Sequence, residues 1–402
     1  MTIRIGRTLP PAAAPIPLND ILHALPSCLS DDTDGFCFEE EIRKEFKQRY
    51  CLLVSSGKAA LVLILRALQK LYPGRDEVLI PAFTCYSVPA AIKKAGLKVK
   101  LCDTGVRSLD LDKKQLRKII ETNKKENKIL CVLVTHLFGC PADFYGIKEI
   151  VGDRIPIVED AAQAMGGEIE KNKMGTLGDI AFFSLGRGKA LSTMEGGVII
   201  TNRRDLGDIL CDLLKELEIY TVFDTVKLVV KTILTTLLQH PLLFWLPKAL
   251  PFLRLGETLY DCDFPMQKMS SFQKGLAANW QKRLQMHQKV RRANIKFWHG
   301  RMPHNLAMVC LRQKEISLIR LPVLTESVEV RNAFCLKSEQ AGCGIMPTYP
   351  TAINEIPQIA EEFTGQRFPN AKKTAKCLMT LPVHEYVKKG DRSKINNMLL
   401  GI

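Results

Sequence analysis

Several patterns with a direct functional meaning are missing from this chain of 402 residues. Its thirteen cysteines are odd in number and include no Cys-x-x-Cys pair, so neither a disulfide framework nor a zinc site is indicated. No lysine and arginine run is long enough to form a nucleic-acid-binding arm, although the net charge of +15 favours anionic partners. The composition therefore predicts a globular protein of the reducing cytoplasm, without a metal site, that acts on small anions.

Long apolar segments are also lacking. The N-terminus has charges but no uninterrupted apolar core of the kind that a signal peptide needs, so secretion is not expected. The most membrane-like stretch, 232–247, has sixteen uncharged residues. That is fewer than the roughly 20 apolar residues of a spanning helix, and Gln239, His240 and Pro241 interrupt it. A simple transmembrane helix is therefore not expected.

Short apolar runs alternate with helical patterns such as 56–71 between residues 50 and 202. Several of these runs are apolar without alternation, as strands buried on both faces are. The expected strands are 77–82, 98–103, 129–137, 155–160, 180–185 and 196–201. This pattern predicts an α/β fold with a mostly parallel sheet.

The pattern changes after residue 202. A helix is expected over 206–220 and a long amphipathic helix over 270–298, with an apolar insert between them. Mixed strands and helices return from 316–324 onward. We expect a large domain, 1–285, and a smaller C-terminal α+β domain, 286–402.

The segment Ser-Ser-Gly-Lys-Ala-Ala-Leu at 55–61 matches a phosphate-binding loop only in part. The loop of nucleotide triphosphatases needs glycine where this chain has Leu52, and serine or threonine where it has Ala59. What remains is a Ser-Gly turn at the start of a helix, whose free N–H groups and dipole can hold a phosphate. The alternative is an ordinary helix N-cap.

Asp160 ends a buried strand, at the sheet edge where open α/β folds bind their ligands. A buried carboxylate needs a cationic partner, and a protonated pyridine nitrogen would be one. Gln163, one helical turn further on, can donate to a neighbouring oxygen of the same ring. The alternative is that Asp160 caps a helix that begins at Ala161.

Lys189 stands in a loop that is flanked by glycines on both sides. A loop lysine is usually a solvated surface charge. Here the strand-end carboxylate, the helix start and the lysine are together the parts of a pyridoxal phosphate site. The glycines would let the backbone approach the cofactor closely.

Five blocks of the chain resemble the sugar aminotransferases of the DegT/DnrJ/EryC1/StrS family, which have the fold type I architecture of aspartate aminotransferase. The two blocks around Asp160 and Lys189 are together the most specific. The resemblance covers nearly the whole chain, with blocks at 80–103, 136–143, 159–164, 178–197 and 368–384.

The resemblance implies roles for three residues around the cofactor ring. Lys189 would form the Schiff base and shuttle a proton between carbons. Asp160 would pair with the pyridine nitrogen, and Gln163 would donate to the ring hydroxyl oxygen.

The resemblance also implies a phosphate cradle and a stacking position. Ser184 would bind the phosphate through its hydroxyl, with the backbone amides of Gly57 and Lys58 completing the cradle. The family's stacking position falls on Cys85, so either this thiol or Tyr86 would stack on the ring.

The chain departs from the family pattern before the long helix. Met266 stands where the family has an asparagine that reaches the partner subunit's cofactor phosphate, and Lys268 stands at the family's arginine. Lys58 replaces the family's threonine and could supply charge at this phosphate. A homodimer is expected, since fold type I sites lie at a subunit interface and the apolar face of 270–298 needs cover. Which residues cross over is left open.

The implied reaction is transamination, with glutamate as amino donor and the keto group of a nucleotide-linked sugar as acceptor, in polysaccharide or secondary-metabolite biosynthesis. Related dehydratases replace the lysine by histidine, whereas Lys189 is intact. Two further alternatives are a non-catalytic regulator that keeps the fold and an aminotransferase for a membrane-associated sugar precursor.

The insert 226–255 is the basis of the membrane alternative. Pro241 should split it into two short helices, and lysines flank an apolar centre with Phe244 and Trp245. Such pieces suit peripheral contact with the inner face of the cytoplasmic membrane. The competing interpretation is a lid or dimer arm that buries the same residues against protein.

Overall fold

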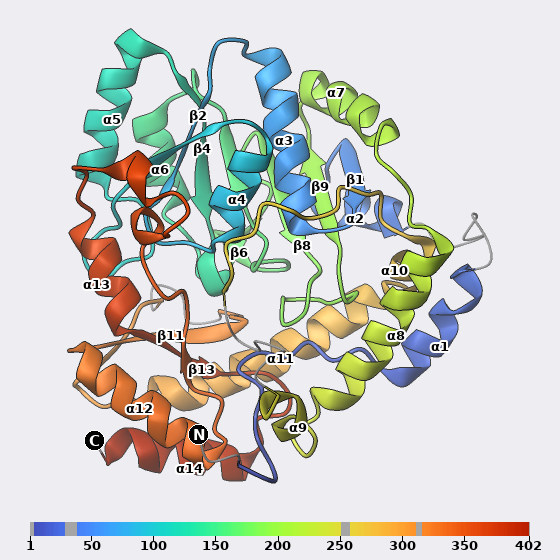
Figure 1. Ribbon diagram of the computed structural model, residues 1–402, viewed down its shortest axis with the longest axis vertical. Helices are drawn as coiled ribbons and strands as arrows, with labels where there is room; N and C mark the ends of the chain where they lie inside the picture. Colours follow the sequence, from blue (N-terminus) through green and yellow to red (C-terminus); the bar gives the residue numbers. More distant parts are fainter. Residues whose placement is uncertain (1–3, 29–37, 251–257, 311–315, 402) are drawn as a thin grey trace.

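A seven-stranded sheet forms the centre of the computed structural model, which describes residues 4–28, 38–250, 258–310 and 316–401 (Figure 1). The strand order is β1-β9-β8-β5-β4-β2-β3. Strand β9 pairs antiparallel with β1 and β8, and the other neighbours pair in parallel. The expected α/β fold with a mostly parallel sheet is therefore confirmed. The strands are β1 (Tyr50–Val54), β2 (Glu77–Pro81), β3 (Lys98–Cys102), β4 (Ile129–Thr135), β5 (Ile157–Asp160), β8 (Ile180–Ser184) and β9 (Gly197–Thr201).

Helices cover this sheet because both of its faces are apolar. All seven residues of β4 are buried, as expected for a strand with no alternation of polarity. In Figure 1 helices α3 and α4 lie across the sheet in front of its central strands. The helices of this region are α2 (Phe38–Phe46), α3 (Gly57–Leu71), α4 (Ser87–Lys94), α5 (Lys113–Glu126), α6 (Phe144–Val151) and α7 (Arg204–Lys215). A short hairpin, β6 (Glu168–Ile169) and β7 (Asn172–Lys173), leads into β8.

A second, antiparallel sheet lies in the C-terminal part, in the order β10-β11-β13-β12. Its strands are β10 (Leu306–Met308), β11 (Arg320–Thr325), β12 (Met346–Pro347) and β13 (Leu378–Pro382), with helices α12 (Val328–Ala341), α13 (Pro369–Cys377) and α14 (Lys389–Leu400). The strand expected at 316–324 begins four residues later. The residues just before β11 pair with a different part of the chain: the Ile319 N–H donates to the carbonyl of Phe138, which follows β4, at 2.9 Å.

The helix expected over 270–298 is interrupted. It forms α10 (Ser271–Leu276) and α11 (Trp280–His299), because Asn279 leaves the helical conformation at φ −108° and ψ 30°. Its side-chain amide donates to Asp20 of α1 (Leu18–Ala24) at 3.2 Å. Figure 1 shows α11 crossing between the two sheets. The expected domain boundary at 285 falls inside α11 and stays a prediction.

The apolar insert forms α8 (Val222–Leu238) and α9 (Trp245–Lys248), and the turn between them contains Pro241. The predicted split is confirmed, although residues 251–255 of the insert lie outside the described residues. Helix α7 ends at Lys215, so the helix expected over 206–220 is shorter. No helix in the described part of the chain is both long and apolar enough to span a membrane.

Candidate active site

The sequence-predicted residues gather at the carboxyl ends of the parallel strands. Asp160 is the last residue of β5 and Ser184 the last residue of β8, and these two strands are paired in parallel. Gly57 begins α3, directly after β1. Because carboxyl ends of parallel strands share one edge, strand-to-helix turns and strand-end side chains converge there.

Gly57 and Ser184 are in direct contact. A β-carbon on Gly57 would lie 2.8 Å from the Ser184 β-carbon and 3.2 Å from its Oγ. A β-carbon on Gly197 would lie 2.3 Å from the Ser56 carbonyl oxygen. Only glycine fits at both positions, and the hydroxyl of Ser184 thus lies beside the first turn of α3, whose N–H groups lack intrahelical acceptors. These groups form a cradle whose N–H and hydroxyl donors suit a phosphate.

The helix-cap alternative for this segment is also correct in part. Ser56 is the N-cap of α3, and its Oγ accepts the Ala59 N–H at 3.1 Å. That cap uses the third N–H of the helix. It does not engage the N–H groups of Gly57 and Lys58, so a cap and an anion site can coexist in one turn.

Asp160 is a buried carboxylate with few partners. It is 5% exposed, and its Oδ1 accepts the Ala162 N–H at 3.1 Å. Burial raises its pKa, while that hydrogen bond, Lys189 and His136 lower it. Residues 162–166 form turns and no helix begins at Ala161, so the helix-cap alternative for Asp160 is wrong. A cation placed at its free oxygen would favour the charged form.

Lys189 lies in the loop between β8 and β9 and is only partly exposed. Burial lowers the pKa of its amine, and the charges of Cys85 and Asp160 act in the opposite direction. Arg320 lowers this pKa further. A lysine with a lowered pKa carries more of the neutral, nucleophilic amine, so Lys189 is not a solvated surface charge.

Gln163 is held between two partners. Its Oε1 accepts the Phe138 N–H at 2.8 Å, and its Nε2 donates to the Tyr349 hydroxyl at 3.2 Å. The Tyr349 ring is buried and lies 6.2 Å from the Phe138 ring, with 15° between their planes. The predicted donation of Gln163 to a cofactor oxygen stays a prediction, since its donor is directed at Tyr349 here.

Cys85 and Tyr86 differ in their availability for stacking. The Tyr86 hydroxyl accepts the Thr351 N–H at 2.9 Å, and its ring lies 6.4 Å from that of Tyr349. Cys85 is partly exposed, and its sulfur accepts the Ser87 hydroxyl at 3.0 Å. Cys85 also acts electrostatically on Lys189, which places the thiol near the amine. The geometry therefore favours Cys85 over Tyr86.

Lys58 points toward the segment that holds Met266. Its ammonium lies 3.9 Å from Asp261 and 4.1 Å from the centre of the Phe264 ring. Burial lowers its pKa, and Asp261 raises it. Met266 is packed against the main core of the same chain.

Sequence reasoning missed Tyr349 and Arg320, both from the C-terminal part. Arg320 opens β11, and its charge acts on Lys189 and Tyr349. A lone arginine in the apolar run 316–324 was a usable signal for it. Tyr349 follows β12 in an irregular segment, and no local pattern singles it out.

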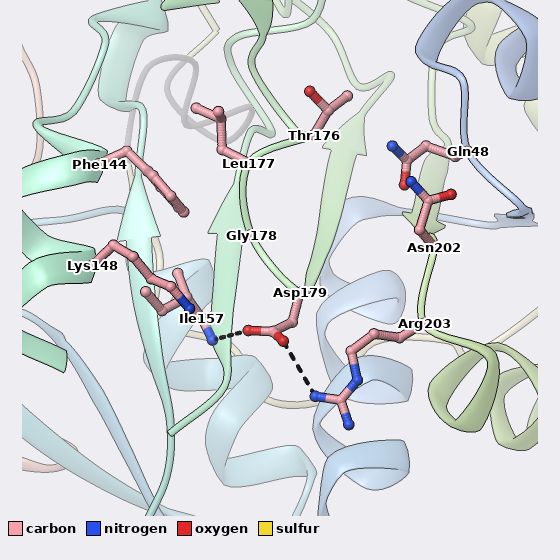
Figure 2. A pocket seen from close by; sticks show the side chains of 10 residues that line it. All are labelled: Gln48, Phe144, Lys148, Ile157, Thr176, Leu177, Gly178, Asp179, Asn202 and Arg203. Atoms are coloured by element: carbon pink, nitrogen blue, oxygen red, sulfur yellow. Dashed lines mark hydrogen bonds and ion pairs between the residues drawn. The ribbon is translucent and has the colours of Figure 1, made fainter. Parts of the chain in front are cut away.

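A pocket at the opposite edge of the sheet is lined by polar groups that pair with one another. It is lined by Ile157 and Asp179, which stand at the amino ends of β5 and β8 (Figure 2). Asp179 accepts the Ile157 N–H at 2.8 Å and pairs with Arg203 at 3.3 Å. These groups satisfy one another across the sheet edge, far along the strands from Asp160 and Ser184.

Comparison with known proteins identifies the segment that carries the site. The model of the DegT/DnrJ/EryC1/StrS aminotransferase family matches residues 34–217. The matched residues, a little under half of the chain, are similar to this family. The segment includes Gly57, Asp160, Ser184 and Lys189, so the resemblance that these residues suggested is confirmed.

Two curated relatives show the extent of the similarity. GDP-4-keto-6-deoxy-D-mannose 3-dehydratase of Escherichia coli O55:H7 is 31% identical over 179 residues, 43% of this chain and 45% of that protein. GDP-perosamine synthase of Escherichia coli O157:H7 is 34% identical over 172 residues, 42% of this chain and 45% of that protein. The chain thus matches less than half the length of these relatives.

Solved structures extend the likeness to the whole fold. An aminotransferase of this family from Brucella abortus superposes with a TM-score of 0.74 at 17% identity, covering 96% of this chain and 95% of its own. Helicobacter pylori PseC, an aminotransferase involved in pseudaminic acid biosynthesis, gives 0.78 at 14% identity, covering 98% and 99%. At these identities the likeness shows the fold, which confirms the expected fold type I architecture.

Proposed function

We propose that this protein is a pyridoxal phosphate-dependent aminotransferase that moves an amino group from glutamate to the keto group of a nucleotide-linked sugar. One observation carries the proposal: a buried carboxylate, an amine of lowered pKa and a helix start beside the Ser184 hydroxyl lie at one sheet edge. Few other ligands would need all three groups.

The residues at this edge fit the cofactor. Ser184 and the N–H groups of Gly57 and Lys58 would hold its phosphate, and Asp160 would hold its pyridine nitrogen protonated. Lys189 would bond to its aldehyde, and Cys85 would lie against the ring. When bound, the cofactor supplies an electron sink for the substrate carbon that exchanges its amine.

Lys189 has a second role, as the base and acid that moves the proton. Burial lowers the pKa of its amine, so the neutral form needed to take up a proton is accessible nearer neutral pH. Asp160 and Cys85 stabilise the ammonium form that results, which favours return of the proton. The same side chain can therefore both take up the proton and return it.

The substrate class rests on the relatives and on charge. The matched relatives have names that include GDP-linked sugars, and a 3-aminotransferase of a UDP-linked glucosamine from Acidithiobacillus ferrooxidans is 32% identical over 154 residues. The net charge of +15 suits a diphosphate-bearing substrate. These observations also support a place in polysaccharide or secondary-metabolite biosynthesis.

Dehydration of a similar sugar is the nearest competing reaction, because one relative is a dehydratase. Lys189 favours aminotransfer, since the resemblance implies histidine at this position in the dehydratases. A regulator that keeps the fold without activity would not need the lowered pKa of the Lys189 amine.

We also propose a homodimer, on the resemblance alone. The apolar face of 270–298 does not support it, because Trp280, Leu284 and Trp298 of α11 are buried within the chain itself. Light scattering of the purified protein tests this proposal, and an active monomer of 45.1 kDa would contradict it.

A peripheral membrane contact is proposed for α8 and α9. Of the twenty-one large apolar side chains exposed in the described residues, eleven lie within 222–250. The exposed Lys227 lies beside this face, and interfacial helices combine such apolar surface with cations. This observation also favours the alternative of an aminotransferase that acts on a membrane-associated sugar precursor.

Flotation with anionic liposomes at low salt tests the contact. Leu234→Gln with Leu237→Gln should abolish binding, while Leu336→Gln on α12, a leucine that is exposed at least as much, should not. If wild type stays unbound, or if the double variant instead breaks a dimer, the membrane proposal is wrong and the dimer-arm alternative is favoured.

The proposed activity is tested with a panel of keto nucleotide sugars. The protein is loaded with pyridoxal phosphate and mixed with glutamate, and the cofactor's absorbance is followed as each sugar is added. A spectral change that requires both glutamate and one sugar supports the proposal. A protein that takes up no cofactor contradicts it.

A further inference from the structure

Two buried arginines of α11 hold the backbone of the Lys189 loop. The Nη2 of Arg291 donates to the Lys189 carbonyl at 2.9 Å, and its Nη1 donates to the Ala190 carbonyl at 3.0 Å. The Nη2 of Arg283 donates to the Ser192 carbonyl at 3.1 Å. Three of the four peptide carbonyls from 189 to 192 are therefore fixed by one helix.

Arg291 also binds a segment from the start of the chain. Its Nη2 donates to the Ala13 carbonyl at 3.1 Å, so a single guanidinium joins the helix, the lysine loop and the N-terminal segment. The planar guanidinium reaches these three carbonyls from two nitrogens that are held in a fixed geometry, whereas a lysine ammonium would present its donors from one nitrogen on a flexible stem.

The burial of Arg291 is costly, which argues for a specific use. The side chain is 1% exposed, and its three hydrogen bonds to the described residues go to neutral carbonyls. Its Nε has no partner there, and burial lowers its pKa to about 10. The facing carboxylate, Glu385, pairs with His287 at 3.2 Å. A buried cation without a bonded anion weakens the fold, so stability alone does not account for it.

On its other side, the lysine loop is weakly held. Gly188 has a φ of +68°, a conformation that glycine adopts without strain. The Lys189 N–H reaches the Gly186 carbonyl only at 3.3 Å. The carbonyl side of Lys189, where the arginines bind, is thus the better-fixed side of this residue.

We propose that Arg291 and Arg283 are positioning residues that fix the backbone of 189–192 and thereby the direction in which the Lys189 side chain enters the site. This inference rests on the proposed role of Lys189, and it adds residues that never touch the cofactor. The groups that face the amine itself are Cys85, Asp160 and Arg320. By fixing the backbone, the two arginines keep the Lys189 amine close to these three groups.

The test uses the protein freed of cofactor, so it does not depend on aminotransferase activity. The rate at which an amine-reactive acylating reagent labels Lys189 is measured against pH by mass spectrometry, which gives the pKa of this amine. In Arg291→Lys the loosened loop should let the amine reach water, and its pKa should rise by about one unit toward the ordinary value. Arg283→Met should shift it in the same direction by less.

Arg203→Lys is the matched control. Arg203 is a half-buried arginine that pairs with Asp205 and Asp179 at the opposite sheet edge. Its replacement should lower the melting temperature and leave the Lys189 profile unchanged. An unchanged profile in folded Arg291→Lys overturns the proposal, and so does an unchanged profile in Arg283→Met. If neither variant folds, the arginines hold the whole fold and the proposal also fails.

Discussion

Gly57 and Ser184 approach so closely that a β-carbon on Gly57 would lie 2.8 Å from that of Ser184. Contact at this distance is not tolerated, so either α3 or the end of β8 would have to move. Both elements supply the phosphate donors of the proposed site. Their contact therefore couples the shape of the cradle to one glycine.

Gly57→Ala is expected to weaken cofactor binding. Forcing the two elements apart costs about 1–3 kcal/mol, which corresponds to a loss of affinity of about fivefold to a hundredfold. Titration of the apo-protein with pyridoxal phosphate, followed by its absorbance, measures this. Gly390→Ala in α14 is the control, because a β-carbon there meets open space. Equal affinities for the two variants would show that the cradle lies elsewhere.

Asp160→Asn should separate stability from activity. Burial raises the pKa of Asp160 above its ordinary value, so this carboxyl stabilises the fold below its unfolded pKa and loses that contribution as the pH rises through its folded pKa. Near neutral pH the cofactor-free variant should therefore be at least as stable as wild type. Thermal unfolding across pH measures this.

The same variant should lose turnover by orders of magnitude, because a neutral amide no longer holds the pyridine nitrogen protonated. Cofactor binding should largely persist, since the phosphate cradle is separate. Undiminished turnover would mean that Asp160 serves only the backbone N–H of Ala162.

Tyr349→Phe removes the hydroxyl that accepts the Gln163 amide. The loss of one buried hydrogen bond should lower the free energy of unfolding by about 1 kcal/mol. Denaturant titration measures the change. Tyr145→Phe is the comparison, because its hydroxyl accepts the Asn172 amide on the surface at 2.9 Å. Similar losses in both variants would count against a specific contact across the two parts of the chain.

The sequence predicted six of the seven strands of the large sheet, all but the edge strand β1, and the residues proposed for the site at its carboxyl edge. Strands such as 77–82 and 180–185 are short apolar runs bounded by turns, and their ends carry Pro81 and Ser184 as the structure has them. Asp160 and Lys189 could be predicted because each is a charged residue in a mostly uncharged stretch of the chain. A carboxylate ends an apolar strand, and a lysine lies between glycines.

What the sequence could not show depends on distant contacts. Helix α10 separates from α11 because Asn279 bonds to Asp20, about 260 positions earlier. Tyr349 reaches Gln163 through the folding of the C-terminal part, and Arg291 reaches the lysine loop across about a hundred positions. Such pairings follow from the packing of whole elements and leave no local pattern.

The central claim is that Lys189 transfers an amino group from glutamate to a keto nucleotide sugar. Its most direct test mixes the cofactor-loaded protein with glutamate labelled with ¹⁵N at its amine and with GDP- and UDP-linked keto sugars. Mass spectrometry then follows the isotope. We predict a ¹⁵N-labelled amino sugar with wild type and none with Lys189→Ala, whose fold should persist. Equal transfer by the variant, or none by wild type with any sugar of the panel, would contradict the account.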